Sequence, residues 1–141
     1  MKFDDGKTIA VKYSRPSMRG RKIFGELVPY GKEWRTGANA ATSFTTDSAL
    51  DIGGTAIPAG NYTLYTIPGE KSWQLIVNKQ TGQWGTNYDE AQDLARIPMK
   101  VSQLPSVLET FTISLDKKGA KSATLKIEWD LTSASVNIAE K

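Results

Sequence analysis

The chain has 141 residues, of which 39% are hydrophobic and 23% charged, values typical of a soluble globular protein with one domain and a substantial core. It contains no cysteine and no histidine, which excludes disulfide bonds, thiolate nucleophiles, histidine-based triads and zinc sites made from these residues. Catalysis would therefore depend on carboxylates, lysine, tyrosine or a hard metal ion bound by oxygen ligands. No apolar run approaches the roughly 20 residues that a membrane span needs, so we predict no membrane insertion.

Alternating apolar and polar residues predict a series of short β-strands. They are residues 7–13, 41–46, 49–52, 62–67, 72–78, 93–101, 110–115, 123–129 and 134–138. Turn-forming residues separate several of these strands, notably Gly53 with Gly54, residues 68–71 and residues 130–133. One short helical turn fits residues 19–27. We predict an all-β fold, a single antiparallel β-sandwich or jelly-roll-like domain over residues 1–141, in which residues 1–6 form a flexible lead-in.

The net charge of +3 is unevenly distributed, because residues 1–40 hold nine Lys or Arg against four Asp or Glu. The excess centres on Arg15, Arg19, Arg21 and Lys22. This basic run predicts either a site for an anion or a solvated basic loop, and the second is the more common outcome. No nucleic-acid-binding motif accompanies the run and the remaining residues are acidic overall, so we predict no nucleic-acid partner.

Residues 29–42 concentrate aromatic, charged and amide side chains between glycines and fit neither a helix nor a regular strand. Arg35 offers a planar fork for a carboxylate, a phosphate or a pair of sugar hydroxyls, and Asn39 lies among small residues that let the backbone turn tightly. The alternative is structural, because an arginine beside Trp34 often stacks on aromatic rings and an asparagine often caps a turn.

A second irregular segment, residues 80–90, contains Trp84 and Tyr88 on either side of a glycine. These aromatic side chains could stack on a sugar ring or another planar ligand, or they could anchor the loop over the core. The neighbouring carboxylates Asp89, Glu90 and Asp93 lack the regular spacing of a calcium loop, so we interpret them as solvated and predict no metal site. Trp73 and Trp129 alternate with polar residues and are predicted to be core.

Four stretches together resemble a bacterial family catalogued as domain of unknown function 2911. They are Arg-Pro-Ser-Met-Arg-Gly-Arg-Lys-Ile-Phe-Gly at 15–25, Pro-Tyr-Gly-Lys-Glu-Trp-Arg-Thr-Gly-Ala-Asn at 29–39, Ile-Pro-Ala-Gly-Asn-Tyr-Thr-Leu-Tyr-Thr-Ile-Pro at 57–68 and Asn-Lys-Gln-Thr-Gly-Gln-Trp-Gly at 78–85. The resemblance implies a periplasmic or extracellular location, since similar proteins are typically exported, and it implies no activity. Many members have glutamate where this chain has Ala40, which counts against a carboxylate mechanism common to the family.

Three hypotheses follow from the sequence. The first is an exported, non-catalytic domain that binds a small polar ligand such as a carbohydrate through Arg35, Asn39, Trp84 and Tyr88, with the basic run 15–22 as a rim and with no cofactor. The second is a hydrolase or lyase that works through Tyr88, Asp89 or Lys32, and it requires one of these groups to have a strongly shifted pKa in a cleft. The third is a structural or protein-interaction module.

Overall fold

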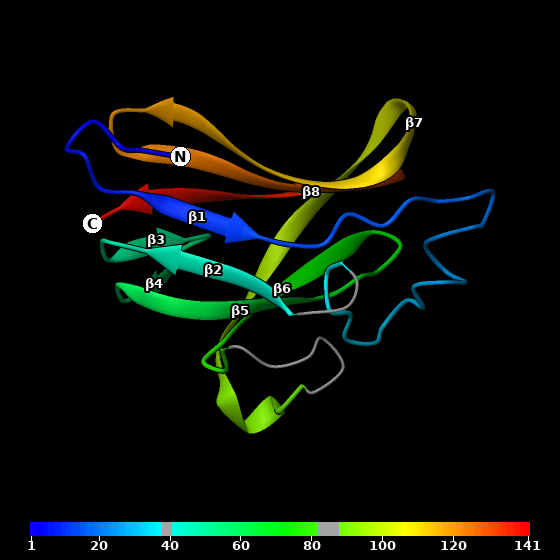
Figure 1. Cartoon of the computed structure of the whole chain (residues 1–141), viewed down its shortest axis with the longest axis horizontal. Helices are drawn as coiled ribbons and strands as arrows, with labels where there is room; N and C mark the ends of the chain where they lie inside the picture. Colours follow the sequence, from blue (N-terminus) through cyan, green and yellow to red (C-terminus); the bar gives the residue numbers. More distant parts are fainter. Residues whose placement is uncertain (38–40, 82–87) are drawn as a thin grey trace.

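A computed structural model describes residues 1–37, 41–81 and 88–141 and confirms the all-β prediction (Figure 1). The strands are β1 (Ile9–Lys12), β2 (Thr42–Thr46), β3 (Leu50–Ile52), β4 (Thr55–Ile57), β5 (Gly60–Ile67), β6 (Ser72–Asn78), β7 (Asp93–Gly119) and β8 (Ser122–Glu140). Within the described ranges the one helical turn is a 3-10 turn, η1 (Glu90–Gln92), and residues 19–27 form non-helical turns instead. No helix in this part of the chain is long and apolar enough to span a membrane.

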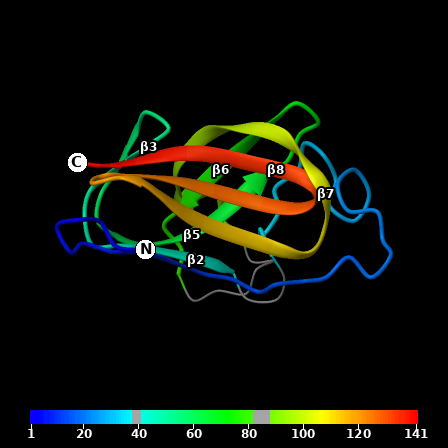
Figure 2. The same ribbon diagram turned by 90° about the horizontal axis from the view of Figure 1, so that it is seen from above.

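All eight strands belong to one antiparallel sheet in the order β1-β2-β5-β6-β7-β8-β3-β4. The sheet is strongly curved, and the long ribbon formed by β7 and β8 lies over the β2 and β5 strands in two perpendicular views (Figures 1 and 2). Strand β7 pairs with β6 over residues 93–100 and with β8 over residues 100–119. The two layers of the predicted sandwich are therefore parts of one continuous sheet.

The curvature brings the segment after β1 against the second half of β7. The Tyr13 hydroxyl donates to the Ile113 carbonyl oxygen over 3.2 Å, and the Phe111 amide donates to the Pro16 carbonyl oxygen over 2.9 Å. These bonds join one edge of the sheet to a strand that is four places away in the strand order. As a result, the segment that carries the basic run lies beside the second half of β7.

Strands β7 and β8 are longer than the sequence predicted. Residues 93–101 and 110–115 belong to one strand, and so do residues 123–129 and 134–138. The predicted turn at residues 130–133 is wrong: Asp130 adopts a φ of 55°, and the register shifts between Gln103 and Leu108 while the ladder continues. Such an irregularity bends a β-ribbon without reversing it, which is how the ribbon passes from one layer to the other.

The predicted turns at Gly53 with Gly54 and at residues 68–71 are confirmed, and each joins two antiparallel strands as a hairpin. Strands β5 and β6 pair from Thr63 with Asn78 to Ile67 with Gln74, and β3 pairs with β4 around the two glycines at 53 and 54. Gly53 has a φ of 57°, and a Cβ atom there would lie 2.7 Å from the Cγ2 atom of Ile97. The turn therefore requires glycine both for its backbone conformation and for its close packing on β7.

The interior of the curved sheet holds one hydrophobic core. Trp73 on β6 and Trp129 on β8 are 1% and 2% exposed, which confirms the prediction that both are core residues. Other large side chains of this core that are at most 1% exposed include Phe3, Ile9, Ile23, Phe44, Leu50, Ile52, Ile57, Leu64 and Phe111. Phe3 belongs to this core although residues 1–6 were predicted to form a flexible lead-in.

Candidate functional site

The basic run is held against β7 and then turns sharply. The Met18 amide donates to the Glu109 carbonyl oxygen over 2.9 Å, and the Arg21 amide donates back to the Met18 carbonyl oxygen over 3.1 Å. Between them Arg19 and Gly20 have φ values of 53° and 73°, so two successive residues are in the left-handed region. This turn projects the Arg19 and Arg21 side chains from one short corner.

The segment 31–37 is held against a different strand, β5. Trp34 exchanges two backbone hydrogen bonds with Thr66, of 2.7 and 3.0 Å, on the edge of β5 that β2 occupies further along. The motif at 29–42 is therefore an extension of the sheet followed by a corner. It places Trp34 on the inner side, where the core aromatic residues lie.

The corner is fixed by buried threonine hydroxyls. Thr36 is fully buried with a φ of 56°, an uncommon conformation for a β-branched residue. Its hydroxyl donates to the Trp34 carbonyl oxygen over 3.1 Å and lies 3.2 Å from the Thr66 hydroxyl, while Thr42 donates to the Thr36 carbonyl oxygen over 2.7 Å. Backbone strain that the surroundings hold in place in this way is found preferentially at ligand-binding sites. It fixes the backbone on the C-terminal side of Arg35.

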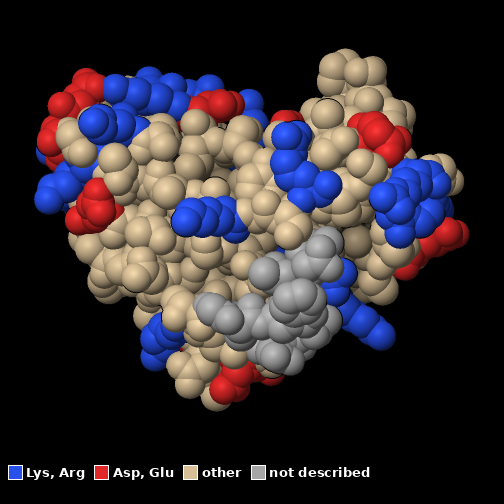
Figure 3. Space-filling model, viewed as in Figure 1, with Lys and Arg blue, Asp and Glu red and all other residues tan. Residues whose placement is uncertain are grey.

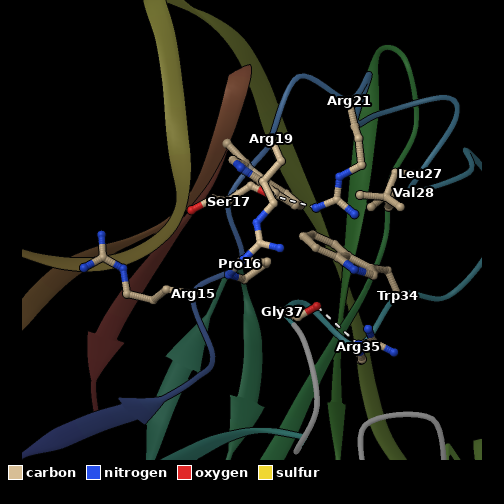
Figure 4. A pocket seen from close by; sticks show the side chains of 11 residues that line it. Arg15, Pro16, Ser17, Arg19, Arg21, Leu27, Val28, Trp34, Arg35 and Gly37 are labelled. Atoms are coloured by element: carbon tan, nitrogen blue, oxygen red, sulfur yellow. Dashed lines mark hydrogen bonds between the residues drawn. The ribbon is translucent and has the colours of Figure 1, made fainter.

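A pocket of about 480 Å³ opens between these two segments (Figure 4). Its lining residues come from both segments, from the turn at residues 27–28 between them and from β8: Arg15, Pro16, Ser17, Arg19, Arg21, Leu27, Val28, Trp34, Arg35, Gly37 and Trp129. The volume is within the range of pockets that bind small molecules. Four arginines separated by up to twenty positions in the sequence thus share one concave site, which we call the arginine pocket.

The apolar wall of the arginine pocket is continuous with the core. The rings of Trp34 and Trp129 are nearly parallel, with an interplanar angle of 10° and centroids 6.2 Å apart. Trp34 also makes edge-to-face contacts with Phe24, Trp73 and Phe111. The half-buried Trp34 therefore joins the pocket to a tightly packed aromatic cluster and has little freedom to move.

Arg15 differs from the other three arginines. Its guanidinium group donates to the Phe111 carbonyl oxygen and the Thr112 hydroxyl, each over 3.2 Å. Figure 4 shows the Arg15 side chain directed away from Trp34 and the remaining arginines. Arg15 therefore ties the basic segment to β7 and forms the edge of the pocket.

Arg19, Arg21 and Arg35 gather around Trp34 (Figure 4). Arg21 donates to the Met18 and Ser17 carbonyl oxygens over 2.9 and 2.8 Å, and Arg35 donates through Nε to the Gly37 carbonyl oxygen over 3.3 Å. Toward the residues that the structure describes, both leave several of their five N–H groups unused. The Arg19 side chain makes no hydrogen bond or ion pair within residues 1–37, 41–81 and 88–141.

The arginine pocket carries positive charge that no ion pair among the described residues offsets. None of its arginines forms an ion pair with a carboxylate in the part of the chain that the structure describes. Glu109 lies close by, but it accepts a hydrogen bond from the Arg19 backbone amide, over 3.0 Å. In Figure 3 basic side chains lie at the right-hand end of the molecule, over the loop that follows β1, with acidic side chains beside them.

Tyr88 lies outside the arginine pocket, in a second polar cluster. Its hydroxyl donates to Asp93 over 2.5 Å and accepts from Arg96 over 3.2 Å, and its ring packs on Tyr65 with centroids 4.5 Å apart. Arg96 also pairs with Glu90 and Asp93, at 3.0 and 3.2 Å. Burial and the hydrogen bond to Asp93 raise the pKa of Tyr88 to about 12, so its phenol is neutral at physiological pH.

The structure therefore brings some of the predicted ligand-binding residues together and separates another. Arg35 shares a pocket with three of the four residues of the basic rim, whereas the exposed Lys22 does not line it. Tyr88 is engaged in the second cluster. Asn39 and Trp84 lie outside the described residues. The sequence interpretation missed the participation of Trp34, whose position beside Arg35 in an irregular segment was the available signal.

The groups named for a catalytic mechanism have other partners or lie in the open. Asp89 accepts a hydrogen bond from the Ala91 amide and begins η1, and Lys32 is exposed. The raised pKa of Tyr88 stabilises the protonated form, opposite to what a base or nucleophile needs. Across the described residues no cluster of three or more acidic side chains is arranged to hold a metal ion.

Residues 1–138 match the model of a family described as "Protein of unknown function (DUF2911)". The chain belongs to this family. The resemblance carried by the four motifs is thus confirmed over almost the whole length of the chain. No curated protein and no solved structure matches it. DUF2911 membership brings no activity with it, so the function has to be argued from the arginine pocket.

Proposed function

We propose that this protein is an exported, non-catalytic domain that binds a small polar ligand, such as a carbohydrate, in the arginine pocket. One observation carries the proposal: guanidinium groups from two separate segments line a single pocket beside Trp34, and no described carboxylate pairs with them. Arginine donors beside an aromatic ring are well suited to polar ligands with an apolar face, because the ring contacts that face while the donors orient the polar groups.

The rigidity of the surroundings supports binding. Trp34 is fixed by the aromatic cluster, and Arg35 is flanked by the strained and buried Thr36. A pocket that is already formed does not have to be ordered by its ligand, so more of the interaction free energy appears as affinity. The pocket is also of a size for a small molecule, which favours this function over that of a protein-interaction module.

The test is a ligand screen on the wild-type protein, measured by thermal unfolding and by tryptophan fluorescence. A ligand that binds only the folded state raises the melting temperature, and by RT ln(1 + [L]/Kd) a concentration of 100 Kd adds about 2.7 kcal/mol to stability. The panel should contain neutral mono- and disaccharides, acidic sugars, amino acids and small dicarboxylates. We expect at least one class to raise the melting temperature in a saturable way.

The decisive comparison uses two variants of the same charge change. Arg35→Gln removes a pocket arginine, while Lys22→Gln removes a neighbouring positive charge that does not line the pocket. We expect the first to abolish the ligand-induced shift and the second to retain it. Equal loss in both variants would assign the effect to general charge, and no shift with any compound in the panel would refute the proposed function.

A further inference from the structure

We infer that the ligand of the arginine pocket carries an anionic group, a carboxylate, phosphate or sulfate, and that Arg19, Arg21 and Arg35 bind it. This inference rests on the proposed function and specifies the chemical class of its ligand. It is carried by the hydrogen-bonding state of the three guanidinium groups and by their common position around Trp34.

The three guanidinium groups have N–H donors that are not used within the described residues. A guanidinium group has five N–H donors and no acceptor. Within the described residues, Arg35 donates only through Nε to one carbonyl oxygen, Arg21 donates to two carbonyl oxygens, and the Arg19 side chain donates to none. Each hydroxyl of a neutral ligand such as a hexose carries an O–H donor beside its two acceptor lone pairs, and guanidinium groups offer that donor no acceptor. An oxyanion is an acceptor throughout and matches it.

The three arginines also concentrate positive charge in the pocket. Three permanently charged groups gathered in one pocket repel one another, since none of them loses its proton in a protein. Among the described carboxylates, Glu109 accepts a hydrogen bond from the Arg19 amide and offsets part of this charge, but none forms an ion pair with the three guanidinium groups, and Glu90 and Asp93 pair with Arg96 instead. A bound oxyanion relieves it and gains charge-assisted hydrogen bonds from several guanidinium groups together.

Backbone carbonyl oxygens hold the Arg21 and Arg35 side chains in place. The carbonyl oxygens of Ser17, Met18 and Gly37 bind the Nε atoms of Arg21 and Arg35 and one terminal nitrogen of Arg21. These backbone acceptors fix the two side chains while leaving terminal nitrogens available, which is the arrangement needed for a bidentate contact with a planar or tetrahedral oxyanion. Trp34 lies between these side chains in Figure 4, and its ring provides an apolar surface for the remainder of the ligand.

The experiment compares sugars that share one ring and differ in whether they carry an anionic group. D-Glucuronate and D-glucose differ by a carboxylate in place of a hydroxymethyl group, and D-glucose 6-phosphate adds a phosphate to the same ring. Melting temperature is measured with each at millimolar concentration, with ionic strength kept constant by added KCl because salt screens charged contacts. We expect glucuronate or glucose 6-phosphate to raise the melting temperature while glucose at equal concentration leaves it unchanged.

The same titrations on the double variant Arg19→Gln/Arg35→Gln test where the anion binds. Arg21 is left in place because its two bonds to carbonyl oxygens help to form the corner. We expect at least a tenfold weaker affinity in the double variant and less than a twofold change in Lys22→Gln. We also expect glucuronate affinity to stay constant between pH 5.5 and 9, since the arginines and the carboxylate keep their charges across that range, and to fall as salt increases.

Distinct outcomes overturn the inference and the proposed function. Equal stabilisation by glucose and glucuronate, lost in the double variant, would overturn the anion requirement and leave the proposed function intact. Stabilisation by anions that survives in the double variant would place the anion elsewhere and overturn the inference. Absence of any shift with glucuronate, glucose 6-phosphate, inorganic phosphate and sulfate would also overturn it, and failure of the wider screen as well would refute the proposed function.

Discussion

Arginines occur in two contrasting environments in this protein. Arg96 donates to the hydroxyl of Tyr88 and pairs with two carboxylates, on Glu90 and Asp93. Arg19, Arg21 and Arg35 in the arginine pocket donate to backbone carbonyl oxygens or to no described group. An arginine with carboxylate partners completes an internal network, whereas arginines left without such partners around a cavity are available to a ligand. The difference also separates Arg35 from Tyr88, which the first hypothesis from the sequence had placed in one site.

The largest loss of stability is expected on truncating Trp34, because this side chain joins the arginine pocket to the core. We expect Trp34→Ala to destabilise the protein by about 3 kcal/mol, since truncating a tryptophan packed among aromatic side chains leaves a cavity. Urea unfolding followed by far-ultraviolet circular dichroism measures the loss. Trp34→Phe retains part of the packing and should cost less than half as much. A loss below about 1 kcal/mol for the alanine variant would show that the pocket wall is not continuous with the core.

The next largest effect concerns the second cluster. Asp93 accepts hydrogen bonds from Tyr88 and Arg96 and also from Asn78, a fully buried residue on β6. We expect Asp93→Ala to destabilise the protein by about 2 kcal/mol, because it leaves buried donors without an acceptor. Glu90→Ala is the matched control: the Glu90 side chain is 75% exposed and among the described residues it binds Arg96 alone, so its loss should cost less than about 0.5 kcal/mol. Equal costs for the two variants would contradict a structural role for the cluster.

Strand positions were predictable from local alternation, and the long β7–β8 ribbon was not. Trp73, Leu75 and Val77 occupy alternate positions of the predicted strand, and they are buried on β6 as expected. The ribbon depends on the left-handed Asp130 and on a register shift that involves the opposite strand. A turn and a bulge share the same local residue preferences, so only the cross-strand partner distinguishes them.

The composition of the candidate site was only partly predictable for the same reason. Arg35 and the basic run meet because one segment pairs with β5 and the other with β7, and the curvature of the sheet brings those strands together. Nothing in the spacing of the two motifs encodes that closure. The position of Tyr88 depends on Tyr65 and Asp93, two partners on different strands, and the aromatic character of residue 88 alone does not specify them.

A third expectation concerns alkaline pH. The pKa of Tyr88 is raised to about 12 in the folded protein, against a value near 10 in the unfolded chain. Between these values the unfolded chain releases the proton and the folded protein keeps it, so this tyrosine makes stability fall as pH rises from 10 to 12 and has no such effect below 10. Tyr88→Phe should show a shallower decline over that interval in chemical denaturation. Parallel declines in the two proteins would contradict the burial of the Tyr88 hydroxyl.

The smallest expected effect is also the most informative about function. Arg35 contributes one hydrogen bond of 3.3 Å to a backbone carbonyl oxygen and no described ion pair, so Arg35→Ala should change the free energy of unfolding by less than about 1 kcal/mol. The measurement is thermal and urea unfolding at fixed pH and salt, with Asp93→Ala as a reference for a broken buried network. A loss of about 2 kcal/mol or more would mean that Arg35 ties the corner together, and the arginine pocket would lose its best candidate for ligand binding. Unchanged stability combined with lost anion binding would assign Arg35 to the ligand and not to the corner. A residue whose removal weakens the bound state and leaves the folded state unaffected acts by contacting the ligand.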